Sequence, residues 1–183
     1  MPISGYTSDL PSDILLDSGV LYVGTSVRGV SRGGLSFDPG KSWNNIEFDG
    51  KRSDVLGLHR VTKFEPVISG TMLEFDSAEL VEYEPGLTSA GTGTVVYTMK
   101  DAGTLLASGD YMTDVRLVFE RGAQSGAYAA VHFPKALVRK WSVKGVDNDV
   151  AEIAVEIVAV LDMSGGQLTD CPYKIELRAT LPT

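Results

Sequence analysis

The feature that most constrains the fold is a repeated alternation of apolar and polar residues between turn-forming clusters. It is clearest in residues 173–179, where charged residues alternate with Tyr173, Ile175, Leu177 and Ala179. In a β-strand, successive side chains point to opposite faces, so a period of two predicts one buried and one exposed face. The segment therefore predicts a strand whose apolar side chains point inward and whose Lys174, Glu176 and Arg178 point outward.

The longest apolar segment, residues 150–161, allows two interpretations. On a strand, Glu152 and Glu156 would share the face opposite a row of aliphatic residues, but they are also one helical turn apart. The many β-branched residues and the flanking turn clusters at 147–149 and 164–166 favour a strand.

Further strands are predicted by the same criteria, and residues 87–94 are predicted to form a Gly/Thr/Ser loop. The best helix signal spans residues 76–84: Asp76 can cap it, Glu79 completes a capping box, and Pro85 and Gly86 end it. Leu80 and Tyr83 are its expected buried pair. The fold prediction is a mostly β protein, an antiparallel β-sandwich or barrel with one short α-helix. The other predicted strands are 20–23, 35–37, 43–48, 59–64, 67–75, 95–99, 113–121, 127–133 and 137–143.

The domain organisation follows from length and local composition. The 183 residues fit a single domain at 20–183, preceded by a Ser-, Asp- and Pro-rich N-terminal arm at 1–19. Residues 24–57 are rich in glycine, and Asp38-Pro39-Gly40 is a strong turn signal. Residues 38–57 are therefore predicted to form a long exposed loop or hairpin with little core of its own.

Composition narrows the classes of partner. The chain is 43% hydrophobic and 22% charged, which is ordinary for a globular protein. Its net charge of −8 and its scattered Lys and Arg residues disfavour a surface that grips nucleic acid, but are compatible with one that lets DNA pass. Cys171 is the only cysteine, which fits folding in a reducing cytoplasm. No apolar run approaches the ~20 residues of a membrane span, and the N-terminus lacks the pattern of a secretory signal.

Motifs for catalysis are weak. Residues 29–33 match the G-x-S-x-G nucleophile motif around Ser31, but the motif needs a following helix and the glycine-rich residues 34–40 will not form one. His59 and His132 both lie in strand-like segments, which favours a structural role. Glu152 and Glu156 would lie about 13 Å apart on a strand, too far for a glycosidase pair. Residues 91–93 are too short for a dinucleotide-binding fingerprint.

Metal binding is not predicted either. The two histidines and the cysteine show no zinc spacing. Asp147, Asn148 and Asp149 with Glu152 partly resemble a calcium loop, but the central glycine is missing. A turn between strands explains them. The sequence thus predicts a non-enzymatic protein with no cofactor.

The order of segments resembles a known family. A Ser/Asp-rich arm precedes an apolar strand and a glycine-rich loop, followed by FDPGKSWNNIEFDG at 37–50 and GLHRV at 57–61, a short helix and a long sheet. This is similar to the major tail proteins of long-tailed bacteriophages, which build the tail tube. The similarity spans most of the chain, and residues 35–75 carry its most diagnostic part.

The resemblance implies a structural virion protein whose hexameric rings stack into a tube that conducts DNA into the host. The tape measure, terminator and tail-tip proteins would be its other partners, and assembly would take place in the host cytoplasm. The loop at 38–57 would reach the neighbouring ring through three apolar anchors and three charged residues. These are Trp43, Ile46 and Phe48, and Lys51, Arg52 and Asp54. Burial of Trp43 and Phe48 in their own core, and simple solvation of Lys51 and Arg52, are the alternatives.

Three other functions remain open at this level. A tail terminator would form a ring without a tube, and the tube of a gene transfer agent or contractile injection system would share the same architecture. A β-sandwich module that binds sugars or decorates a virion would be a monomer or a small oligomer.

Overall fold

The fold is antiparallel and mostly β, as the alternation predicts. The computed structural model describes residues 15–29, 31–47, 49, 57–73, 80–91, 94–121, 128–145, 151–161 and 171–178, without the side chains of 15–18, 120, 121 and 178. Every strand pairing among these residues is antiparallel, and they contain one short α-helix. None of the described helices is long and apolar enough to cross a membrane.

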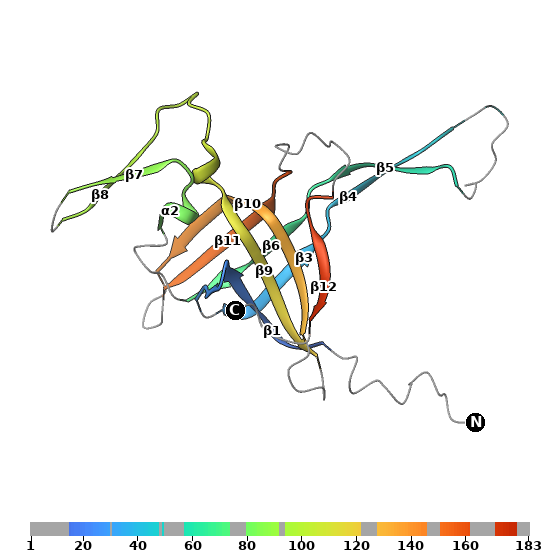
Figure 1. Cartoon of the computed structure of the whole chain (residues 1–183), viewed down its shortest axis with the longest axis horizontal. Coiled ribbons are helices and arrows are strands. Elements are labelled where there is room, and N and C mark those ends of the chain that lie inside the picture. The colour runs from blue at the N-terminus through green and yellow to red at the C-terminus, as the bar shows by residue number, and fades with distance from the viewer. Residues whose placement is uncertain are drawn as a thin grey trace.

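An eight-stranded sheet forms the body of the molecule (Figure 1). Its order is β2 (Ser26–Val27), β1 (Leu15–Val23), β9 (Met112–Arg121), β10 (Tyr128–Lys144), β11 (Glu152–Ala159), β6 (Val67–Met72) and β3 (Ser31–Asp38). The eighth strand, β12 (Lys174–Arg178), pairs with β10. The sheet curls until β1 and β3 lie side by side, but these two strands do not pair. The result is sandwich-like and not a closed barrel.

Two hairpins stand apart from this sheet. One pairs β4 (Lys41–Asn45) with β5 (His59–Phe64), and the other pairs β7 (Leu87–Ala90) with β8 (Val96–Met99). Both project away from the body of the molecule (Figure 1). The helix α2 (Leu80–Tyr83) and the 3-10 turn η2 (Ser108–Asp110) flank the second hairpin in sequence.

The core lies inside the curl of the sheet. Its fully buried side chains come from five strands of the sheet and include Leu21, Ile68, Leu117, Phe133 and Ile157. Tyr83 of α2 joins this core at 3% exposure, and its hydroxyl donates to Sδ of Met72 over 3.5 Å. The predicted end of the helix before Pro85 is confirmed; Leu80 is only half-buried, and residues 76–79 lie outside the described part.

The prediction of two strands at 127–133 and 137–143 is wrong, because β10 runs unbroken through Pro134. Proline has no N–H to give to a neighbouring strand. Here it falls opposite Asp114, where the ladder between β9 and β10 skips from Val115–Phe133 to Thr113–Lys135. Asp114 has a φ of 60°, and its carbonyl accepts a hydrogen bond from the N–H of Gly24 over 3.0 Å. The ladder is thus already interrupted where Pro134 has no donor.

Within residues 150–161, β11 spans Glu152–Ala159, so the strand interpretation is confirmed there. Its inward residues Ile153, Val155 and Ile157 are buried. The carboxylates of Glu152 and Glu156 each contact an arginine of another strand, Arg32 at 2.8 Å for Glu152 and Arg139 for Glu156. These two glutamates therefore form ion pairs across the sheet.

Two boundaries differ from the prediction. The arm at 1–19 ends earlier than expected, because β1 begins at Leu15 and passes a register irregularity between Leu16 and Val20; residues 1–14 lie outside the described part. The predicted loop at 87–94 is wrong in its first half, which is strand β7. Threonine and leucine occur in both loops and strands, so only the pairing with β8 makes residues 87–90 a strand.

The β4–β5 hairpin continues the β3–β6 pair beyond the sheet. Asp38 pairs with Val67, and Lys41 pairs with Phe64 after the Asp38-Pro39-Gly40 turn that the sequence predicts. The Asp38 carboxylate accepts from the N–H of Gly40 over 2.8 Å, and the N–H of Glu65 donates to the carbonyl of Gly40 over 3.0 Å. Gly40 has a φ of 53°, and a Cβ placed there would lie 2.0 Å from the carbonyl oxygen of Glu65. Gly40 is therefore required at this turn.

Replacement of Gly40 by alanine should destabilise the protein, and Gly24 offers a matched control. Both residues have positive φ, but a Cβ at Gly24 meets no atom within 4 Å. We expect Gly24→Ala to cost about 1 kcal/mol, and Gly40→Ala about 3 kcal/mol because its backbone must also shift. Chemical denaturation of both variants measures the difference. Equal losses would mean that the close approach to Glu65 does not constrain the turn.

Candidate functional site

The predicted contact residues that the structure describes lie on the projecting β4–β5 hairpin. Trp43 is on β4 opposite Val61, and Ile46 follows the strand, with its N–H donating to the carbonyl of Leu58 over 2.9 Å. Their exposed fractions are 61% and 52%. Burial of Trp43 in its own core is therefore excluded. Phe48, Lys51, Arg52 and Asp54 lie outside the described residues, so their predicted roles stay predictions.

The base of this hairpin carries its own polar contacts. Nζ of Lys63 lies 2.6 Å from a carboxylate oxygen of Glu65. The hydrogen bond and the positive charge of Lys63 lower the pKa of Glu65 from its ordinary value. Nζ of Lys41 lies 5.9 Å from the centre of the Phe64 ring, within cation–π range. The hairpin therefore has polar contacts at its base and exposed apolar side chains further out.

The β7–β8 hairpin is a second projecting element, and the sequence prediction missed it. Its exposed apolar side chains are Val95 at 48%, Val96 at 57% and Met99 at 50%. Leu87 pairs with Met99 and Ala90 with Val96, and the hydroxyl of Thr88 donates to the carbonyl of Thr98 over 3.1 Å. One sequence signal was available: residues 85–99 contain no Asp, Glu, Lys, Arg or His.

Ion pairs fix the root of the β7–β8 hairpin to the body. Glu82 of α2 accepts two hydrogen bonds from Arg28, at 2.7 and 3.0 Å, and Glu84 contacts the indole N–H of Trp141 on β10. After β8, Nζ of Lys100 lies 2.5 Å from the carboxylate of Asp110, which also accepts from the N–H of Ala107 over 2.6 Å. These contacts lower the pKa of Asp110, first through the hydrogen bond from Lys100 and then through that from Ala107.

A pH-dependent loss of stability should follow from Asp110. Because its pKa is lower in the folded state, its contribution to stability is present above the ordinary value of 3.8 and is lost as the pH falls through the folded pKa. Asp110→Asn keeps an acceptor for Ala107 but loses the charge. We expect the variant to have a lower Tm than the parent at pH 7, and this difference to shrink at the acid end of a Tm series.

Asp101→Asn is the matched control for that series, because it removes one negative charge from a nearby exposed position. Asp101→Asn should leave Tm unchanged both at pH 7 and at the acid end of the series. A Tm difference between Asp110→Asn and the parent that persists unchanged at low pH would contradict the assignment to the Lys100–Asp110 pair.

The third surface is the edge strand β12. Ile175 and Leu177 pair with Val131 and Ala129 of β10, so they lie on the core side of the sheet as the alternation predicts. Their predicted burial is wrong, because they are 67% and 71% exposed, whereas Tyr173 is buried. Val131 and Ala129 are themselves buried, but the core does not continue along this face as far as β12. Ala179 lies outside the described residues.

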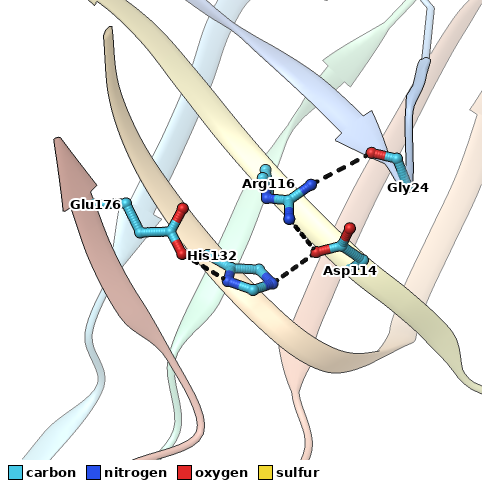
Figure 2. A network of polar contacts seen from close by, with 5 residues as sticks. All are labelled: Gly24, Asp114, Arg116, His132 and Glu176. Atoms are coloured by element: carbon cyan, nitrogen blue, oxygen red, sulfur yellow. Dashed lines mark hydrogen bonds and ion pairs between the residues drawn. The ribbon is translucent and has the colours of Figure 1, made fainter. Parts of the chain in front are cut away.

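A polar network on the opposite face ties β12 to its neighbours (Figure 2). Nδ1 of His132 lies 3.0 Å from a carboxylate oxygen of Glu176, and Nε2 lies 2.7 Å from Oδ1 of Asp114. Arg116 lies 2.6 Å from the same oxygen of Asp114 and 3.5 Å from the carbonyl of Gly24. The side chains of His132 and Arg116 are each only 13% exposed. The network joins strands β9, β10 and β12 to the turn after β1.

Removal of the Glu176 carboxylate should loosen β12. A hydrogen bond to a charged group contributes about 1.5–3 kcal/mol, so in Glu176→Ala the amides of residues 174–178 should exchange at least about tenfold faster. Lys174→Ala is the control, because Lys174 is an exposed residue on the same face of the strand. Hydrogen exchange with mass spectrometry measures both variants. Unchanged exchange in Glu176→Ala would show that strand pairing alone holds β12.

The remaining candidates for chemistry are not brought together. Ser31 begins strand β3 and lines a pocket of about 240 Å³ with Leu21, Leu35 and other residues that include no histidine or carboxylate. His59 is exposed on β5, far along the chain from the His132 network. Asp147, Asn148 and Asp149 lie outside the described residues. Within the described part, no three metal-ligating side chains gather at one point.

The fold and these three surfaces define a mostly β, antiparallel protein with two projecting hairpins and an edge strand that pairs with one described neighbour. The chain matches no protein-family model, and the search of curated proteins finds no significant match. The surfaces themselves are therefore the basis for a functional proposal.

Proposed function

We propose that this chain is a structural subunit that assembles with copies of itself into hexameric rings, which stack into a tail tube of the kind built by long-tailed bacteriophages. The observation that carries the proposal is the exposed apolar end of the β4–β5 hairpin, with Trp43 at 61% and Ile46 at 52% exposure. The β4–β5 hairpin projects beyond the body (Figure 1), so its exposed side chains are accessible to a neighbouring copy.

The energetics favour a contact between copies. Complete burial of a large apolar side chain contributes about 1.5–3 kcal/mol, and an exposed Trp is a typical anchor residue of interfaces. An isolated two-stranded hairpin is at best marginally stable in water, so a partner that covers it also stabilises it. In a ring, every copy makes the same contact to the next ring, and the contacts act together.

The charge of the chain fits a conduit for DNA. Each copy carries a net charge of −8, and a wall of like charge repels a polyanion instead of holding it. DNA would thus be in transit only, and no DNA-gripping surface is needed. Tape measure, terminator and tail-tip proteins would meet the tube along its lumen and at its two ends.

Loss of the two hairpin anchors tests the proposal. We expect the purified wild type to form hollow tubes of even width, seen by negative-stain microscopy and by light scattering over a concentration series. Trp43→Ser with Ile46→Ser should lose the tubes but keep the Tm, because both side chains lie outside the core. Leu105→Ser, which alters a 90% exposed apolar residue outside both hairpins, should retain them.

The outcomes separate the alternative functions. Wild-type rings that never stack favour a tail terminator. A wild-type monomer that binds a glycan favours a binding or decoration module. Tubes that persist in the Trp43 and Ile46 double variant would show that this hairpin is not the contact between rings.

A further inference from the structure

The β7–β8 hairpin has the composition of an interface segment. The chain as a whole is 22% charged, yet the fifteen residues 85–99 contain no charged residue and include Val95, Val96, Tyr97 and several threonines. These residue types favour strands, and exposed strands without charge readily pair with other strands. The outer edges of β7 and β8 pair with no described strand. Ion pairs at its root fix the hairpin to the body.

The edge of β12 has the complementary features. Its only partner among the described strands is β10, and none of them pairs with its other edge. Ile175 and Leu177 lie on the same face of the sheet as the core but outside it, and they are 67% and 71% exposed. A strand added at this edge would complete the ladder and place side chains beside both of them, as in β-strand addition.

Charge also favours contact between these two segments. Two copies with a net charge of −8 each repel one another over most of their surface. The 85–99 segment is uncharged, and β12 has two basic residues and one acidic residue. A joint between them therefore brings together two segments without excess negative charge.

The two segments lie on opposite sides of the molecule (Figure 1). The hairpin therefore cannot reach β12 of its own chain, and pairing must take place between two copies. Such a contact joins two different surfaces, so it leaves one hairpin and one edge free at the ends of every dimer. Repetition of the contact gives a closed ring or an open filament.

We infer that the β7–β8 hairpin of one copy pairs with the other edge of β12 of a second copy, and that this contact closes the ring. The inference rests on the proposed self-assembly, and it names a contact separate from the β4–β5 contact between rings. Val96 on one face of the hairpin and Met99 on the other each bring an apolar side chain to the joint.

A mixing experiment tests this contact without knowledge of its register. The parent is the full chain with Trp43→Ser and Ile46→Ser, which should form rings that do not stack. In this parent, Val96→Lys alters only the hairpin, and Leu177→Lys alters only the edge strand. Each variant alone should be monomeric in size-exclusion chromatography with light scattering, with at least about a tenfold rise in the concentration needed for assembly.

An equal mixture of the two variants should form a one-to-one dimer, because the intact hairpin of one copy still meets the intact edge of the other. A chain with both substitutions should pair with neither variant. Val96→Thr, which keeps a β-branched and uncharged side chain, should retain the rings. The Tm of each variant should equal that of the parent, because Val96 and Leu177 lie outside the core.

The inference is overturned if the parent is monomeric, if Val96→Lys still forms rings, or if the mixture yields no dimer. These outcomes differ from a failure of the proposed function. Parent rings and mixed dimers without any wild-type tube would contradict the tube and support this contact. Wild-type tubes with rings that tolerate both lysine substitutions would support the tube and contradict this contact.

Discussion

The structure depends on the pairing of β10, the long central strand, with three different neighbours. Along its first half it pairs with β9 on one side and β12 on the other, and along its second half it pairs with β11. The change of partner lies around Pro134, where β9 is already irregular at Asp114. Phe133, Ala136 and Val138 of the same strand supply part of the core. β12 pairs only with the first part of β10, because β11 occupies this side of β10 from Ala136 onward.

The His132 network has the same origin. Asp114 is in the left-handed region because the ladder breaks there, and its carboxylate then lies within reach of both Arg116 and His132. His132 in turn contacts Glu176 on β12. A single irregularity in β9 thus accounts for the proline in β10, for the partly buried polar network on the outer face and for part of the attachment of β12. The four side chains of this network resemble a catalytic cluster, but their place in the sheet explains them.

Sequence patterns predicted correctly the turns and strands that depend on residues close by in the chain. The Asp38-Pro39-Gly40 turn, the strand at His59–Phe64 and the strand character of residues 152–159 all follow from turn residues and β-branched residues close by in sequence. The errors arose where a distant neighbour decides the outcome. From sequence alone, Pro134 predicts a break between two strands, because the irregularity at Asp114 on the opposite strand is not visible there. Ile175 and Leu177 were placed on the correct face, but alternation cannot show where the core ends beneath that face. Residues 87–90 become a strand only because β8 pairs with them.

Charge and shape together limit how copies of this chain can meet. Its net charge of −8 makes two copies repel each other, so attraction is favoured in segments that carry apolar groups and little net charge. The β7–β8 hairpin meets this condition, and the strands of the β4–β5 hairpin are basic instead of acidic. Both hairpins carry exposed apolar side chains and project beyond the body in different directions (Figure 1). Two contacts in different directions are the minimum for a tube, because one closes a ring and the other joins one ring to the next. A globular body with a single apolar patch would instead stop at a dimer or a single ring.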